Sequence, residues 1–239
     1  MVLIFTFFTL TGCDALKKSE SSQYHVLLEE KFSSDLKNWW VEGSEKVWIQ
    51  DGRLHIDANN DKNTKGRFCT VWYKKPFESD NLIIEFDAHV IESKLKCNNI
   101  NFFLFFTHPC EKTIYETRDT RSGGEYKLYH NLNGYIFTYL RDRHKKAEVH
   151  PDGSAKARFR IRRCPGFKLS AENFAYHNEA GQTYHIVIVK KGNKLTYSVD
   201  GKVFNEWYDP EPLKFGYFGL RTFMTYLWLD NIIVKSAYN

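Results

Sequence analysis

Short apolar or alternating runs, each ending in a polar or glycine-containing turn, recur along the chain from Tyr24 onward. Apolar and polar residues that alternate with period two are typical of a β-strand with one buried face. A dozen such runs predict strands at 26–32, 46–50, 53–57, 70–73, 82–91, 100–107, 135–141, 157–163, 184–190, 194–199, 216–221 and 225–235. No long stretch of the sequence keeps the 3.6-residue period of an amphipathic helix, so the chain is predicted to be all-β.

Two sharp turns support antiparallel pairing of these strands. Asp51-Gly52 and Asp200-Gly201 each separate two predicted strands, and Asp-Gly favours the type I′ turn because both central residues need positive φ. A dozen strands in 239 residues, with no linker between them, predict one domain, because sandwiches reach this length as single units. The expected fold is a two-sheet antiparallel jelly-roll sandwich spanning residues 24–239.

The N-terminal segment predicts export. Residues 1–12 carry no charged side chain and are almost wholly apolar, but they are too short to span a bilayer. Leu10-Thr11-Gly12-Cys13 matches the bacterial lipoprotein box, in which a peptidase cuts before the cysteine and the thiol receives the lipid. Residues 13–23 are polar and serine- and lysine-rich, as a tether would be. We therefore expect an exported protein, lipid-anchored to a bacterial membrane through Cys13; the alternative is a buried apolar strand that ends in an ordinary cysteine.

Export changes what the remaining cysteines can do. Cys69, Cys97, Cys110 and Cys164 are an even number, and an oxidising compartment permits two disulfides with three pairings. Cys97 and Cys110 flank one apolar strand and are the favoured pair. No spacing of cysteine and histidine indicates zinc.

Several short motifs resemble a known superfamily. They are Phe32…Asp35-Leu36…Trp39…Glu42-Gly43, Asp51-Gly52-Arg53-Leu54, Asn98-Asn99-Ile100-Asn101, Tyr129-His130…Tyr135 and Pro212-Leu213…Gly216…Gly219-Leu220-Arg221-Thr222. Together they resemble the uncharacterised YesU-like families of the concanavalin-A-like lectin/glucanase superfamily, across most of residues 32–235. The resemblance implies a concanavalin-A-like fold and a polysaccharide or oligosaccharide as ligand, bound across one sheet.

Basic residues are concentrated in one predicted strand. Arg158, Arg160 and Arg162 fall on one side of it by alternation, in a chain of net charge +5. A row of arginines on one strand face repels itself unless it meets solvent, carboxylates or an anionic ligand. Guanidinium binds carboxylate or sulfate in a bidentate way, so an acidic sugar would suit it. The alternative is a solvated face with glutamate partners.

Residues 118–141 contain the candidate catalytic groups. A polysaccharide lyase removes the proton α to a uronate carboxyl group, which needs a base, an acid and a cation or amide beside that carboxylate. His130 as base, Tyr135 as acid and Arg160 or Arg162 as neutraliser would form such a set. The alternatives are a structural histidine and a core tyrosine.

Hydrolysis has weaker support in the sequence. It needs two facing carboxyl groups, and Glu85-Phe86-Asp87 resembles the start of a laminarinase-type motif whose second glutamate is replaced by His89. Glu172, on the arginine side of its segment, is the preferred lone carboxylate. Glu125 and Glu116 are further options, and no pair of carboxylates stands out in the sequence.

Four further residues are candidates for binding. Trp72 would stack on a sugar ring if exposed, Asn101 would hydrogen-bond sugar hydroxyls, and Arg221 would reach either a ligand or a core carboxylate. Asp230 occupies the place where several relatives in the superfamily hold a structural calcium, the one cofactor the resemblance implies.

The expected function is that of an exported lipoprotein acting on an anionic polysaccharide, as a polysaccharide lyase. The alternatives are a non-catalytic glycan-binding lipoprotein and a glycoside hydrolase. The sequence carries no phosphate-binding loop and no dinucleotide fingerprint, and nucleic acid is not an expected partner. Oligomeric state does not follow from the sequence.

Overall fold

The structure is a computed structural model that describes residues 24–44, 46–60, 62, 66–110, 112–141 and 149–237. The predicted signal and tether, Cys13 included, lie outside the described residues. None of the described residues forms a helix long and apolar enough to cross a membrane.

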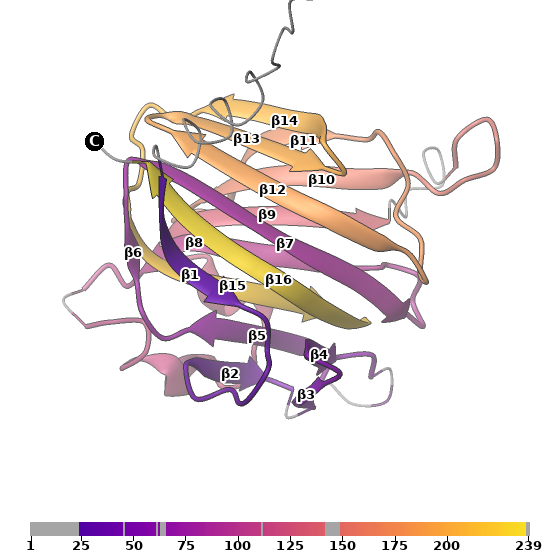
Figure 1. The fold of residues 1–239 in the computed structure, drawn as a ribbon, viewed down its shortest axis with the longest axis horizontal. Helices are drawn as coiled ribbons and strands as arrows, with labels where there is room; N and C mark the ends of the chain where they lie inside the picture. The colour runs from indigo at the N-terminus through magenta and orange to yellow at the C-terminus, as the bar shows by residue number, and fades with distance from the viewer. Residues whose placement is uncertain are drawn as a thin grey trace, which may run out of the picture.

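The described residues form two antiparallel eight-stranded sheets packed face to face (Figure 1). Sheet A contains, in spatial order, β14 (Lys202–Tyr208), β13 (Lys194–Val199), β12 (Thr183–Lys191), β7 (Asn81–Glu92), β16 (Tyr226–Ala237), β4 (Arg53–Asp57) and β3 (Val47–Gln50), with β1 (Tyr24–Glu30) also paired to β16. Sheet B contains β11 (Lys168–Asn173), β10 (Ala157–Cys164), β9 (Asn133–Arg141), β8 (Ile100–Thr107), β15 (Phe215–Phe223), β5 (Phe68–Tyr73) and β2 (Trp39–Gly43), with β6 (Phe77–Glu78) paired to β15. The predicted all-β two-sheet sandwich is confirmed.

Alternation along the strands builds one core between the sheets. In β7 every second residue from Leu82 to Val90 is buried, and the residues between them are half-buried. Phe86 of this strand packs against Phe102 of β8 and Phe218 of β15, at ring-centroid distances of 5.2 and 6.4 Å. The inner faces of both sheets therefore meet in a continuous aromatic and aliphatic layer.

The two Asp-Gly turns adopt the expected conformation. Asp51 and Gly52 have φ of 53° and 69°, and Asp200 and Gly201 have φ of 50° and 76°. Positive φ at both central residues defines the type I′ hairpin, so these turns join β3 to β4 and β13 to β14 as predicted.

Four strands were not predicted from the pattern. Three of them, β2, β11 and β14, lie at sheet edges, and the fourth, β6, has only two residues. The edge strands alternate poorly because they pair with one neighbour only and meet solvent or a loop elsewhere. In β2, for example, Trp39 and Trp40 are both buried.

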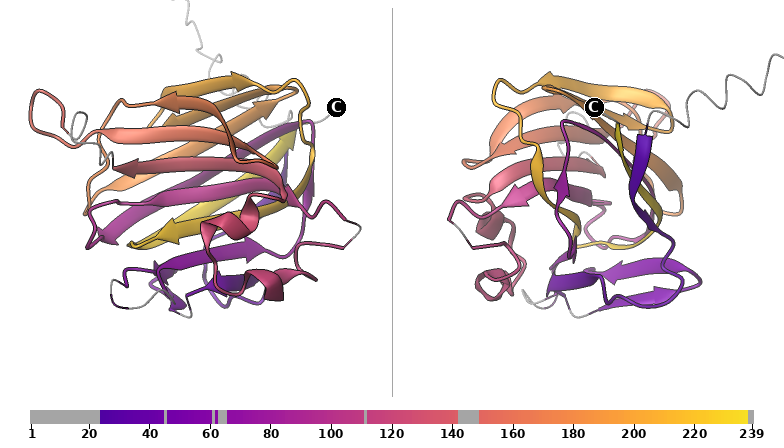
Figure 2. Two further views of the ribbon diagram at one scale, coloured as in Figure 1. Left: turned by 180° about the vertical axis from the view of Figure 1, so that it is seen from behind. Right: turned by 60° about the vertical axis from the view of Figure 1, so that its left-hand side comes forward.

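A loop packs on the outer face of sheet B, the face turned away from the core. Residues 112–132, called the covering segment, contain two short 3-10 helices, η1 (Arg118–Arg121) and η2 (Tyr126–Tyr129). Ile114, Tyr129 and Leu132 of this segment bury a second apolar cluster that includes Trp72 and Phe103 of the sheet. Figure 2 (left) shows the segment, in magenta, lying in front of the lower part of sheet B, with β10 and β11 clear of it.

The favoured disulfide between Cys97 and Cys110 is wrong. All four described cysteines are free, Cys97 being buried and Cys110 exposed. The two thiols stand at opposite ends of the eight-residue β8, which spans roughly 26 Å. A disulfide requires Cα atoms within about 7 Å, so two cysteines that flank one strand cannot pair.

Candidate functional site

One row of side chains crosses all seven consecutive strands of sheet B on its outer face. Directly paired residues in antiparallel strands point to the same side, so their side chains form a line perpendicular to the strands. This polar row consists of Glu42, Thr70, Arg221, Asn101, Thr138, Arg160 and Glu172, from β2 to β11. Acidic residues stand at its two ends and arginines lie inward of them.

At the β2 end of the row, Glu42 is buried in a closed network. Its carboxylate accepts hydrogen bonds from the indole nitrogens of Trp40 and Trp72, at 3.2 and 3.0 Å, and from the Tyr129 hydroxyl at 2.8 Å. Arg121 of η1 forms an ion pair with it at 3.0 Å, with both side chains almost fully buried. This end of the row is therefore internally satisfied and holds the covering segment on the sheet.

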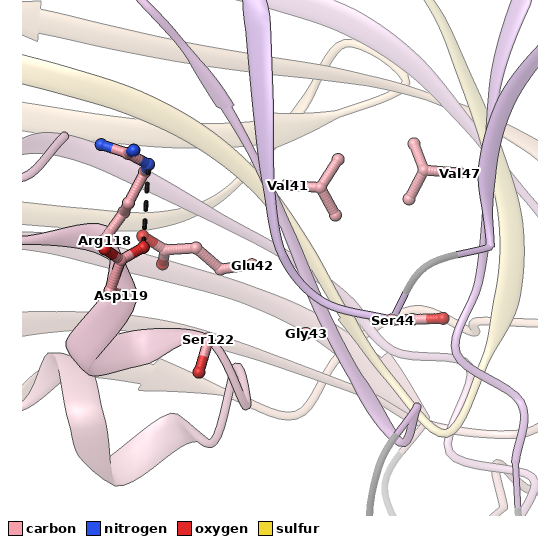
Figure 3. Close-up of a pocket in the computed structure, with 8 residues that line it drawn as sticks. All are labelled: Val41, Glu42, Gly43, Ser44, Val47, Arg118, Asp119 and Ser122. Carbon is pink, nitrogen blue, oxygen red and sulfur yellow. Dashed lines mark ion pairs between the residues drawn. The ribbon is translucent and has the colours of Figure 1, made fainter.

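A pocket of about 320 Å³ lies beside this network, between β2 and η1 (Figure 3). Figure 3 shows Val41 and Val47 facing each other across it and Glu42 directed toward η1. Arg118 and Asp119 approach each other at 3.9 Å on its rim. Because the Glu42 carboxylate is already bonded to four side chains, it is not available to a ligand in this pocket.

A second pocket, of about 300 Å³, lies over the middle of the polar row and is called the outer pocket. Arg221, Asn101, Thr138 and Arg160 come from four adjacent strands of the sheet, and Tyr126 comes from η2. The complete lining is Phe68, Asn99, Asn101, Tyr126, Thr138, Leu140, Arg160, Arg221 and Phe223. Polar groups in the row are thus bordered by aromatic rings, an arrangement common in small-molecule sites.

Three buried polar atoms on residues that line the outer pocket have no hydrogen-bond partner among the described residues. They are the Oδ1 atoms of Asn99 and Asn101 and the Nε of Arg221. These three side chains belong to residues that are 5%, 5% and 2% exposed. A buried polar group without a partner is costly. Two acceptors and one donor gathered in one pocket therefore indicate a polar ligand.

Arg221 is a buried cation without a carboxylate in contact. Its Nη1 donates to Thr70 Oγ1 at 2.8 Å and to the Gly124 carbonyl at 2.7 Å, and its guanidinium lies 4.9 Å from the Tyr126 ring centroid. Burial lowers the pKa of Arg221, yet a guanidinium stays charged at neutral pH. Among the described residues no carboxylate lies within ion-pair distance, since Glu42 is engaged by Arg121.

The three arginines of β10 point outward, as the alternation predicted. Arg160 and Arg158 share the Glu172 carboxylate at 2.7 and 3.4 Å, while Arg162 donates to the Phe167 carbonyl at 3.0 Å and stacks on its ring. Of the three, Arg160 lines the outer pocket. Glu172 acts here as a counter-ion of two of these arginines.

His130 and Tyr135 are not brought together, so the predicted acid–base pair is wrong. Tyr135 is fully buried between the sheets, where its hydroxyl donates to Asp209 at 2.6 Å and accepts from the Leu213 amide at 2.8 Å. Burial and Asp209 raise the pKa of Tyr135. His130 lies on the opposite side of sheet B, at the end of η2.

His130 borders the outer pocket through Tyr126. Its ring stacks on Phe167 at 3.8 Å and meets Tyr126 edge-on at 5.3 Å, and its buried Nε2 has no partner among the described residues. Burial, Arg162 and Arg221 lower the pKa of His130. These surroundings favour the neutral imidazole, and Tyr126, not Tyr135, is the tyrosine beside it.

Two other predicted residues lie away from any open site. Trp72 faces outward but is fully buried beneath the covering segment, with its indole bonded to Glu42, so it offers no stacking surface for a sugar. Asp230 lies on β16 in the other sheet, where its Oδ1 accepts from the Asn231 amide. The described part of the chain contains no group of three or more His, Cys, Asp or Glu side chains that could hold a metal ion.

Several residues of the pocket were not predicted. Asn99 shares the alternation of Asn101, which is a signal that could have identified it. Tyr126 reaches the pocket because the covering segment folds over sheet B, and Phe68 reaches it because β5 pairs with β15. The local sequence carries no signal for either arrangement.

The fold is a galectin-like, concanavalin-A-like sandwich, here with a pocket on the outer face of one sheet. A Bacillus subtilis protein of unknown function with a galectin-like fold is similar over 90% of this chain and 99% of its own, with a TM-score of 0.69 and 19% identity. The carbohydrate-binding module CBM66 from Bacillus subtilis is similar over 86% of this chain and 99% of its own, with a TM-score of 0.56 and 12% identity.

Residues 62–232 match the DUF6250 family, described as a domain of unknown function, and the chain belongs to that family. It is also 23% identical over 183 residues to the uncharacterized protein YesU of Bacillus subtilis strain 168. The aligned region covers 74% of this chain and 76% of YesU. The resemblance to YesU-like proteins is therefore confirmed as a distant relationship.

Proposed function

We propose that this protein binds an acidic carbohydrate in the outer pocket. The observation that carries the proposal is the set of three buried, unpartnered polar atoms on Asn99, Asn101 and Arg221. A sugar hydroxyl both donates and accepts, so one ring could satisfy two amide oxygens and a guanidinium N–H at the same time. The rings of Phe68 and Tyr126 would contact the apolar faces of such a ligand.

The charge of the pocket supports an acidic sugar over a neutral one. Arg221 is 2% exposed, and no carboxylate within the described part of the chain contacts it; burying a charge without a counter-ion is unfavourable. A uronate carboxylate or a sulfate group would supply that counter-ion with charge-assisted hydrogen bonds. Arg160 and Arg162 add positive charge along the same face, with Glu172 as their one acidic neighbour in the row.

Binding without catalysis fits the pocket better than lyase or hydrolase chemistry. The described residues that line it include no Asp or Glu, whereas hydrolysis needs two carboxyl groups. The residues of the predicted lyase set do not share one side of sheet B, because Tyr135 faces the core. The similarity to CBM66, a carbohydrate-binding module by name, also supports a binding protein.

The test is calorimetric titration of the purified protein with matched neutral and acidic glycans. Galacturonate and glucuronate polymers, alginate and a sulfated glycan would be compared with galactan and a β-glucan. We expect binding of at least one acidic glycan, and a loss of about tenfold or more in affinity for Arg221→Lys, because lysine cannot replace a guanidinium fork. Arg53→Lys is the matched control, since Arg53 stacks on Trp228 on the outer face of sheet A.

Each outcome of this panel bears on the proposal. Absence of binding to every glycan would reject it, and equal affinity for neutral and acidic glycans would reject the acidic ligand. Ultraviolet absorbance and reducing ends would be recorded in parallel. A rise of both would show elimination and make the protein a lyase, and reducing ends alone would show hydrolysis.

A further inference from the structure

The polar row is closed at one end and open at the other. Along it, Arg221 and Thr138 are each 2% exposed, whereas the side chains of Arg160 and Glu172 are 19% and 24% exposed. Exposure therefore rises from β15 toward β11. Within the row, the outer pocket is lined from Arg221 to Arg160; on β5 it touches Phe68 but not Thr70, and it does not reach Glu42 of β2.

The covering segment forms the closed end. The Gly43 amide donates to the Ser122 carbonyl at 3.0 Å, and Arg221 donates to the Gly124 carbonyl at 2.7 Å. Gly124 has φ of +68° and lies so close to β2 that an added Cβ would stand 2.9 Å from the Gly43 Cα. No sugar ring fits between backbones in such contact, so a ligand that occupies the pocket cannot continue along the polar row past Arg221 to Thr70 and Glu42.

The open end carries charged groups with hydrogen-bonding capacity. Arg160 lines the pocket, and Glu172 bonds both Arg160 and Arg158 at the edge of sheet B. These side chains are partly exposed, and in the view of Figure 2 (left) β10 and β11 stand clear of the covering segment. A chain that leaves the pocket would therefore pass over β10 and β11.

We infer that the outer pocket receives the terminal unit of a sugar chain, with the next units lying over Arg160, Arg158 and Glu172. This inference rests on the proposed function and adds which part of the glycan is bound. A pocket of about 300 Å³ is at the lower end of small-molecule sites, which suits a terminal unit and not a continuous segment of polymer.

The stoichiometry of binding tests this inference. Size-defined galacturonate oligomers and the corresponding oligomers of any other acidic glycan that binds in the panel would be titrated, and complexes would be sized by analytical ultracentrifugation. We expect one protein molecule per chain whatever the chain length, because each chain has one end of the recognised kind. A number of bound proteins that grows in proportion to chain length would overturn the inference and leave the proposed function intact.

Variants separate the pocket from the exit path. In Arg158→Gln the gain in affinity from monosaccharide to trisaccharide should shrink by about threefold or more, because Arg158 contacts only the later units. Arg221→Lys should weaken binding of monosaccharide and trisaccharide alike, and Arg53→Lys should alter neither. Equal losses at every length for Arg158→Gln would contradict the proposed direction of the chain. Failure of every oligomer and polymer to bind would reject the proposed function itself.

Discussion

Asn101 is the residue of the proposed pocket at which stability and binding can be measured separately. Its side chain is buried in the middle of sheet B, yet its Oδ1 has no partner among the described residues. A buried acceptor without a partner destabilises the folded state by about 1–3 kcal/mol. Such a group is expected where a ligand completes the hydrogen bonds.

We predict that Asn101→Leu keeps or raises the free energy of unfolding, by up to about 1 kcal/mol, while affinity for an acidic glycan falls about tenfold or more. Leucine has nearly the same volume and removes the unpartnered acceptor. Urea unfolding and calorimetric titration measure the two effects. Asn205→Leu is the matched control: Asn205 also has a buried unpartnered side-chain atom but lies on β14 of sheet A, so affinity should not change. A large loss of stability in Asn101→Leu would show that the amide is structural.

At the scale of elements, the covering segment depends on one buried ion pair. Arg121 and Glu42 have side chains 2% and 1% exposed and lie 3.0 Å apart. Arg121 also donates to the hydroxyl of Thr117, the residue before η1, at 3.0 Å, which ties the ion pair to the start of this helix. Breaking a buried pair by removing one charge leaves the other uncompensated in a low-dielectric site.

Glu42→Gln should therefore lower the free energy of unfolding by about 3 kcal/mol or more. Amide hydrogen exchange should accelerate in residues 112–132 before the rest of sheet B, because this pair holds the segment on the sheet. Adding Arg121→Met to Glu42→Gln should restore part of the stability, since it removes the uncompensated cation. A single variant as stable as the parent protein would show that the other bonds of the segment suffice to hold it.

The alternation of apolar and polar residues predicts strands better than it predicts which loops pack over them. The outward direction of Arg160 follows from period-two alternation and is observed. Trp72 also points outward, yet it is buried because residues 112–132 fold back over it. Alternation reports the face of a sheet on which a side chain lies, but not what later covers that face.

At the scale of the whole molecule, we propose that the sandwich is tethered to a bacterial membrane through a lipid on Cys13. The support is the lipoprotein box Leu10-Thr11-Gly12-Cys13 and the polar residues that follow it. A tether of this kind would present the outer pocket to glycans outside the cytoplasm.

In a bacterial expression host, the mature protein should carry a diacylglycerol-type mass increase at Cys13 and fractionate with membranes. Cys13→Ala should abolish both the mass increase and the membrane fractionation, with glycan affinity unchanged because the pocket lies on sheet B. Mass spectrometry of the N-terminal peptide measures this directly. An unmodified Cys13 in the parent protein would remove the basis for export.

The all-β class, most strands, the two Asp-Gly hairpins and the outward face of β10 could be predicted from the sequence. These properties depend on local alternation and on backbone preferences of neighbouring residues. Three further facts follow from tertiary contacts instead: Arg221, Asn101, Thr138 and Arg160 stand in one row, Tyr135 faces the core, and Trp72 is covered. Strand order and register join residues distant in the chain, and the path of residues 112–132 closes one end of that row. The site is a product of pairing between strands, which no single stretch of sequence specifies.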